Sequence, residues 1–213
     1  FSLTNIFGQS SLEGDVNVFN PITTGVPFLS IAPDARGGAM GDVGAATSPD
    51  AYSQYWNPSK FAFIDGAGGV SLSYTPWLRK LVKDIDLAYL SGYYKIADIQ
   101  TVSASLRYFS LGEVMIRKDA TSPAITAKPY DLAVDASYAR ILAENFSMGV
   151  TLRFIYSDLL GGAPVEEAES LTPGAAVAAD ISAFYSSPVV FPEGEGFARG
   201  GLNISNIGSK LSY

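Results

Sequence analysis

The chain has 213 residues, of which 47% are hydrophobic and only 16% are charged, below the roughly 25% of an average soluble domain. Its net charge of −7 and its scattered Lys and Arg exclude a nucleic-acid-binding protein with a basic patch. The absence of Cys and His excludes disulfides and thiolate metal sites, and it removes the commonest general base and metal ligand. We expect no cofactor and no metal.

Residues 1–68 are rich in Gly, Pro, Asn and Ser and show no sustained hydrophobic period. Within them, Ser48-Pro49-Asp50 predicts a helix start, with serine as the cap and proline at the first helical position. Asn57-Pro58 predicts the end of that helix after about two turns, because proline disfavours helical geometry at the preceding residue. We therefore predict that residues 1–68 form a lead-in or plug segment with a short helix.

From Gly69 onward the side chains alternate with a period of two, which predicts β-strands. The pattern is clearest in Phe146–Tyr156, where large apolar residues alternate with Ser, Gly, Thr and Arg. No run of about 18 apolar residues is present, so helical membrane spans are excluded. The seven expected strands are 70–74, 85–95, 102–108, 130–138, 146–156, 175–185 and 197–205.

Three features favour a transmembrane barrel over a soluble β-sandwich. Several strands run about nine to eleven residues, the length that a tilted strand needs to cross a bilayer. Aromatic residues lie toward the strand ends, as interfacial girdles require. The connections alternate between long (75–84, 110–128, 158–173) and short (96–99, 142–145), with 187–195 intermediate. We therefore predict an all-β, antiparallel transmembrane β-barrel in the bacterial outer membrane, with residues 69–213 as its N-terminal part.

The second face of the strands carries small residues and isolated charges rather than many Lys and Glu. This composition is typical of a crowded lumen where a plug meets the wall. The charged residues predicted to face the lumen are Arg107, Asp131, Asp135, Arg153, Asp180 and Arg199.

Seven strands are an odd number, whereas bacterial single-chain barrels use an even number. Asn206–Tyr213 has the composition of a turn between strands. An open sheet edge in hydrocarbon leaves unpaired backbone groups, each costing several kcal/mol. We therefore expect the natural protein to continue beyond this chain, which would be an incomplete barrel.

Motifs for chemistry are weak. The glycine run at 37–44 lacks the spacing and the βαβ context of a phosphate-binding loop. Asp131 and Asp135 are four residues apart on one strand, ~13 Å, too far to act as a carboxylate pair. No G-x-S-x-G elbow is present. The acidic group at 166–169 is interpreted as a solvated loop. We predict that the protein is not an enzyme.

Two stretches carry a resemblance to a known family. Phe28–Ala46 contains the run Arg36-Gly37-Gly38-Ala39-Met40-Gly41-Asp42-Val43-Gly44, and Tyr55-Trp56-Asn57-Pro58-Ser59-Lys60 follows it. Both resemble the start of the PorV family, outer-membrane components of the type IX secretion system of Bacteroidetes, whose relatives include PorQ and, more distantly, the FadL fatty-acid transporters. Asn203–Gly208 also fits the pattern. The family-motif residues of the plug are Arg36, Gly37, Gly38, Gly41, Gly44, Trp56, Asn57 and Pro58.

The resemblance implies a FadL-like barrel of about fourteen strands, of which this chain would supply roughly half. It also implies a carrier that receives translocated cargo by its C-terminal domain and delivers it to the cell-surface attachment complex. The partners so implied are the type IX translocon barrel, a PorU-type sortase and other attachment-complex proteins, cargo C-terminal domains, and outer-membrane lipid or lipopolysaccharide.

Two alternatives stay open. A FadL-like transporter of hydrophobic solutes needs an apolar pocket inside the barrel, which the small, charged second face does not favour. A membrane-embedded lipopolysaccharide deacylase needs an activated serine, which the absence of histidine disfavours.

Overall fold

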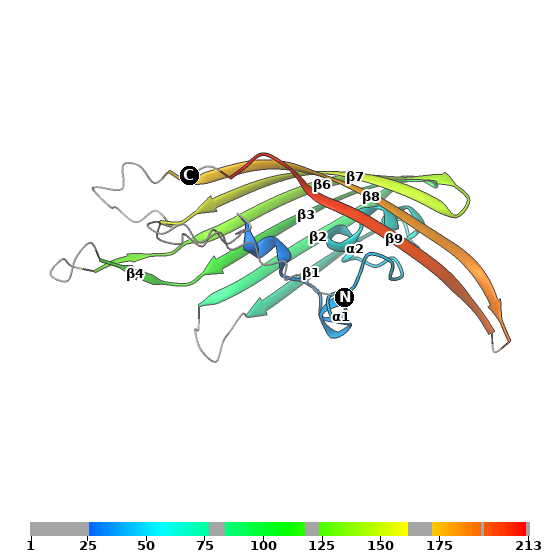
Figure 1. Ribbon diagram of the computed structural model, residues 1–213, viewed down its shortest axis with the longest axis horizontal. Helices are drawn as coiled ribbons and strands as arrows, with labels where there is room; N and C mark the ends of the chain where they lie inside the picture. The colour runs from blue at the N-terminus through cyan, green and yellow to red at the C-terminus, as the bar shows by residue number, and fades with distance from the viewer. Residues whose placement is uncertain (1–25, 77–83, 118–123, 162–171, 193, 212–213) are drawn as a thin grey trace, which may run out of the picture.

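The computed structural model describes residues 26–76, 84–117, 124–161, 172–192 and 194–211. Four short helical segments come first in the described chain, and strands follow (Figure 1). The helical segments are η1 (Pro27–Ser30), α1 (Ala35–Ala39), α2 (Ser53–Trp56) and η2 (Pro58–Phe63). The strands are β1 (Gly68–Pro76), β2 (Ile85–Ala97), β3 (Gln100–Leu111), β4 (Val114–Ile116), β5 (Ile125–Ala127), β6 (Tyr130–Ala143), β7 (Phe146–Asp158), β8 (Gly174–Phe191) and β9 (Gly194–Gly208).

Seven strands form one antiparallel sheet in the order β1-β2-β3-β6-β7-β8-β9. The short strands β4 and β5 make a separate hairpin within the β3–β6 connection. β1 and β9 are the two edges of the sheet, so the described wall is a half-barrel. The expected all-β partial barrel is confirmed, and each of the seven predicted strands is present.

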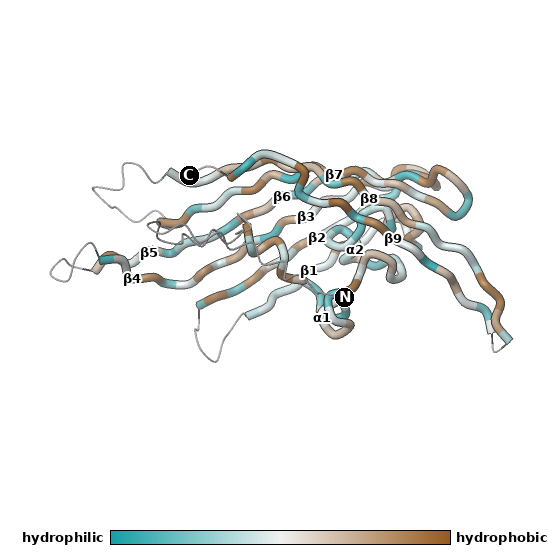
Figure 2. Tube along the Cα trace, viewed as in Figure 1, coloured by the Kyte–Doolittle hydropathy of each residue, from teal (hydrophilic) through white to brown (hydrophobic). Residues whose placement is uncertain are grey.

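The wall has one apolar and one polar face, because successive side chains of a strand point to opposite sides. In β7, Val150, Leu152 and Phe154 are exposed, whereas Thr151 and Arg153 between them are buried. Figure 2 shows the resulting alternation of colour along the strands. Among the described residues, no helix is long and apolar enough to cross a membrane.

The buried polar face is covered by residues 26–64, which we call the plug segment. At one end of the wall, Phe28 packs with Ala133, Ile155 and Ala176, and its ring stacks on Phe109 at 6.3 Å between centroids. Toward the other end, Phe61 stacks on Tyr93 at 5.0 Å. These apolar contacts anchor both ends of the plug segment on the wall.

The predicted intermediate connection at 187–195 is wrong. β8 continues to Phe191 and β9 begins at Gly194, so the two strands form a hairpin that extends beyond the end of β7 (Figure 1). Proline cannot donate a hydrogen bond to a neighbouring strand and is therefore rare inside sheets. Pairing with β9 nevertheless continues through Pro188, which lies opposite Phe197 beyond the last residue of β8 that pairs with β7.

The predicted turn at Asn206–Tyr213 is also wrong at its start, because β9 continues to Gly208. Two residues of β9, Ser205 and Asn206, lie opposite Asp180 of β8, which is a β-bulge. Asn206 has a φ of 62°, and asparagine tolerates this left-handed conformation better than most residues.

The predicted helix start at Ser48 is wrong, since α2 begins at Ser53 and makes about one turn. Asp50 supplies the local acceptor instead: its carboxylate accepts from the Tyr52 N–H at 3.0 Å. The helix ends at Asn57-Pro58 as predicted. The sequence reading did not predict α1, whose cap is Asp34, accepting from the Gly37 N–H at 2.7 Å.

Candidate functional site

The candidate site is the seam where the plug segment meets the polar face of the wall. Wall hydroxyls donate to plug carbonyls: Ser147 Oγ to the Ser59 carbonyl at 2.8 Å, and Thr101 Oγ1 to the Phe61 carbonyl at 3.1 Å. The Gln54 amide bridges two strands, accepting from Ser103 Oγ at 2.6 Å and donating to Ser137 Oγ at 2.7 Å. Small hydroxyl side chains therefore satisfy a backbone that forms no sheet of its own.

Asn57 is the most connected residue of the seam. Its amide nitrogen donates to the carbonyls of Ala45, in the plug segment, and Ala183, in β8, both at 2.9 Å. Its amide oxygen accepts from the Ser59 N–H at 3.2 Å and from the Ser59 hydroxyl. The side chain is fully buried, and all of its hydrogen-bonding capacity is used.

Trp56 joins the two family-motif stretches. Its indole N–H donates to Asp34 Oδ1 at 2.8 Å, while the other oxygen of Asp34 caps α1. A Cβ added to Gly37 would lie 2.5 Å from Trp56 Cζ2, and one added to Gly44 would overlap the indole. Two of the four motif glycines are therefore required by the close approach of one ring.

Lys60 lies between the glycine run and the wall without a carboxylate partner among the described residues. Its Nζ donates to the Gly44 carbonyl at 2.9 Å and to Thr47 Oγ1 at 3.0 Å. Burial lowers the pKa of Lys60 to about 8, and Asp50 partly opposes this shift while Arg36 adds to it. Arg36 itself pairs with Asp50 at 3.1 Å on the surface.

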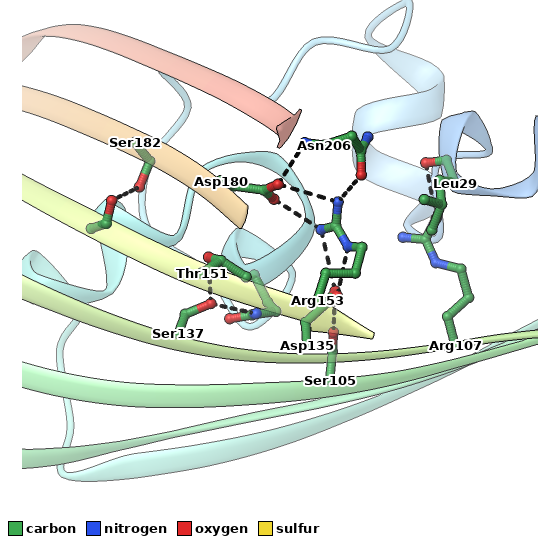
Figure 3. A network of polar contacts seen from close by, with 12 residues as sticks. Leu29, Ser105, Arg107, Asp135, Ser137, Thr151, Arg153, Asp180, Ser182 and Asn206 are labelled. Carbon is green, nitrogen blue, oxygen red and sulfur yellow. Dashed lines mark hydrogen bonds and ion pairs between the residues drawn. The ribbon is translucent and has the colours of Figure 1, made fainter. Parts of the chain in front are cut away.

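A buried cluster of charged residues spans three neighbouring strands, β6, β7 and β8, on the inner face beside the plug segment (Figure 3). Arg153 Nε donates to Asp135 Oδ1 at 2.6 Å, and Arg153 Nη2 lies 3.0 Å from Asp180 Oδ2. Ser105 donates to Asp135 at 3.0 Å. At the β9 bulge, Asn206 contributes its side-chain oxygen to Arg153 at 2.5 Å and its N–H to Asp180 at 2.7 Å.

Arg107 lies apart from that cluster and binds the plug segment directly (Figure 3). Its Nη1 donates to the carbonyls of Phe28 at 3.2 Å and Leu29 at 3.0 Å. Its guanidinium carbon lies 4.7 Å from the ring centre of Tyr55 and 5.3 Å from that of Tyr89. The two arginines and two aspartates of this region sum to zero charge, which limits the cost of burying them.

The six charged residues expected to face the lumen therefore take different positions. Arg107, Asp135, Arg153 and Asp180 are buried on the inner face. Asp131 is half-buried at the second residue of β6, opposite Ser157 of β7. Arg199 is exposed in the β8–β9 hairpin, with its guanidinium 4.8 Å from the ring of Phe197.

Of the remaining motif residues, Pro58 and Gly41 have a structural role and Gly38 has none that the structure shows. Pro58 begins η2 and is buried, and Gly41 has a φ of 79° that favours glycine. Nothing in the structure explains Gly38, which faces open space. The predicted site residues did not include Asp34, Gln54, Lys60, Ser105 or Asn206. Of these, Asp34 had a usable signal as a cap residue three positions before Gly37.

The seam is built from polar contacts between the plug segment and the wall. The described residues contain no group of three or more metal-ligating carboxylates. The acidic group at 166–169 lies outside the described residues. The plug segment is held against the barrel wall by hydrogen bonds and by ring contacts such as those of Phe28 and Phe61.

Comparison with known proteins identifies the family. A family model described as Type IX secretion system protein PorV matches residues 15–213. A search among curated proteins gave no match. Because the family match covers nearly the whole chain, the chain belongs to the PorV family, a component of the type IX secretion system.

Alanine substitutions at two neighbouring glycines of α1 test the packing of Trp56. We expect Gly37→Ala to lower the free energy of unfolding by about 1–3 kcal/mol, because the added methyl group overlaps the indole. Gly38→Ala is the matched control in the same helix and should be neutral or stabilising by up to ~1 kcal/mol. Urea titration of the full-length protein refolded in phospholipid vesicles measures both. Equal effects of the two substitutions would contradict this packing.

Lys60 should make stability depend on pH. With its pKa lowered to about 8, the folded protein loses this proton before the unfolded chain does, so stability increases as pH rises from about 8 to 10.5. Below pH 8 the full cost of the buried charge is present, on the order of 3 kcal/mol. Lys60→Met should lack this component. Urea titrations of both proteins between pH 7 and 10 measure it, and parallel pH profiles would rule it out.

Proposed function

We propose that this PorV-family protein is an outer-membrane carrier that receives translocated cargo proteins by their C-terminal domains and delivers them to a surface attachment complex. Its partners would be the translocon barrel, a PorU-type sortase with its associated proteins, and outer-membrane lipid. The observation that carries this proposal is the family match over residues 15–213. The family is one of secretion components, and we propose no enzymatic step for this chain.

The wall supports a location in the outer membrane. From Phe146 to Tyr156, β7 rises about 33 Å along its axis at ~3.3 Å per residue. At a tilt of about 40°, this corresponds to roughly 25 Å of height, the thickness of the apolar band of outer-membrane barrels. Aromatic residues mark both limits, since Phe146 lies opposite Tyr185, and the Tyr156 ring is 6.0 Å from that of Tyr130.

The polar contacts between the plug segment and the inner face support a carrier over a transporter of hydrophobic solutes. The inner face of the described wall is polar, and the plug segment hydrogen-bonds to β2, β3, β6, β7 and β8. Transport of hydrophobic solutes would need an apolar path through this seam. The proposed binding surfaces are therefore the connections at the rim rather than the lumen wall.

The described strand ends that border the three long connections lie at one end of the wall, because the strands alternate in direction. The one between β3 and β6 contains the β4–β5 hairpin, in which Met115 is exposed, and an ion pair at 2.8 Å joins Lys128 to Glu113 beside it. Parts of all three connections lie outside the described residues. We propose that this rim, facing the cell exterior, holds the cargo domain.

A charged substitution on the outer face should destabilise the folded protein, because this face would lie in hydrocarbon. Leu152 is 68% exposed at mid-height of β7, and we expect Leu152→Arg to cost about 2–4 kcal/mol in vesicles. Val190→Arg, in the projecting hairpin at a residue 81% exposed, is the matched control and should stay within about 0.5 kcal/mol. If Leu152→Arg were as mild as the control, the outer-membrane location would be contradicted.

The carrier role is tested by co-purification. Full-length protein from detergent-solubilised outer membranes should retain an added cargo C-terminal domain. Replacing residues 114–127, which include β4 and β5, with a short Gly-Ser linker should weaken retention at least tenfold. The matched control replaces residues 188–197 at the opposite end, with retention unchanged. Failure of the intact protein to retain any such domain would overturn the proposal.

A further inference from the structure

A cavity of about 370 Å³ lies between the plug segment and β9, next to the charge cluster. Its lining includes the apolar residues Val26, Leu29 and Trp56, and the polar residues Arg107 and Asn203. Cavities of this volume are at the lower end of the range that holds small ligands. The hydrogen bonds that these two polar residues do not make determine which ligand fits.

Arg107 has donors to spare. Its side chain is only 3% exposed, and only its Nη1 donates, to the Phe28 and Leu29 carbonyls. Its Nε and Nη2 have no acceptor among the described residues. The two carboxylates of the buried charge cluster, Asp135 and Asp180, are committed to Arg153. A guanidinium with free N–H groups, held flat by the Tyr55 and Tyr89 rings, matches the two oxygens of a carboxylate.

In the part of the chain that the structure describes, Asn203 lacks a hydrogen-bond donor, whereas Arg107 lacks acceptors for its Nε and Nη2. The amide oxygen of Asn203 is buried and has no hydrogen-bond donor among the described residues. Buried acceptors are normally paired, so a ligand that fills this cavity should bring an N–H or O–H group. The ligand must therefore combine a carboxylate with a nearby donor and a small apolar group for Val26, Leu29 and Trp56.

We propose that this cavity binds an N-acylated α-amino carboxylate, the chemistry of a peptide C-terminus. Its carboxylate accepts from the free N–H groups of Arg107, and its amide N–H donates to the Asn203 oxygen. Its side chain lies against the apolar lining. This site is independent of the cargo-binding rim proposed above, because it lies in the lumen between the plug segment and β9.

Isothermal titration of the full-length protein in detergent micelles with N-acetyl-leucine tests the site. We expect saturable binding of the acid. Its methyl ester, which lacks the carboxylate charge, should bind at least tenfold more weakly. 2-Acetoxy-4-methylpentanoate, in which an ester oxygen replaces the N–H, should bind several-fold more weakly than N-acetyl-leucine. Absence of binding at millimolar concentration, or equal affinity for acid and ester, overturns the proposal.

Two variants assign the contacts. Arg107→Lys keeps the charge but loses the planar fork, and it should weaken N-acetyl-leucine binding by about tenfold to a hundredfold. Because Arg107 also holds η1, Asn203→Ala gives a test that leaves those contacts intact. In that variant, N-acetyl-leucine and 2-acetoxy-4-methylpentanoate should bind equally; a persisting preference for the N–H overturns the role of Asn203. Arg140→Gln, an exposed change outside the cavity, is the control and should bind as the parent does.

Discussion

The amide of Asn57 is the constraint on which the seam depends. One nitrogen joins a plug loop, at Ala45, to the wall, at Ala183, and one oxygen fixes the turn that starts η2. An aspartate has the same size, but it would place an oxygen where the donating nitrogen is, facing the two carbonyls. A serine side chain would be too short to reach either carbonyl. With Asn57 fixed, its neighbour Trp56 is directed toward Asp34 and the glycine run, and Lys60 toward the Gly44 carbonyl. One side chain thus orients both family-motif stretches against β8.

The fold was largely predictable because a wall between an apolar and a polar environment imposes strict alternation. Phe146–Tyr156 carries that alternation without interruption, and β7 extends only two residues beyond it. Prediction failed where local sequence and pairing disagree. Residues 187–195 were expected to be a connection, but β8 and β9 remain paired there, through Pro188, although proline has no N–H to donate. The three-residue strands β4 and β5 are too short to carry a period at all.

The sequence predicted which face of the sheet the site residues occupy, but not which residues they contact. Alternation placed Asp135 and Arg153 on the inner face, whereas their ion pair follows from the register of β6 and β7, which brings the two residues directly opposite each other. Asn206 joins them only because a bulge turns its backbone N–H toward Asp180. The hydrogen bond between Trp56 and Asp34 spans 22 residues of irregular chain, for which no periodic pattern exists.

The order of the chain has a consequence for how the protein assembles. The plug segment precedes every strand of the wall, yet its hydrogen bonds reach Ser137, 83 residues ahead of Gln54, and Ala183, 126 residues ahead of Asn57. Its own helical segments are only four to six residues long and are too short to be stable alone, so it gains little until β8 is in place. Contacts so distant in sequence form slowly, since a long loop must close before they contribute. The wall is therefore the template, and the plug segment docks only after strands that follow it in the chain have formed.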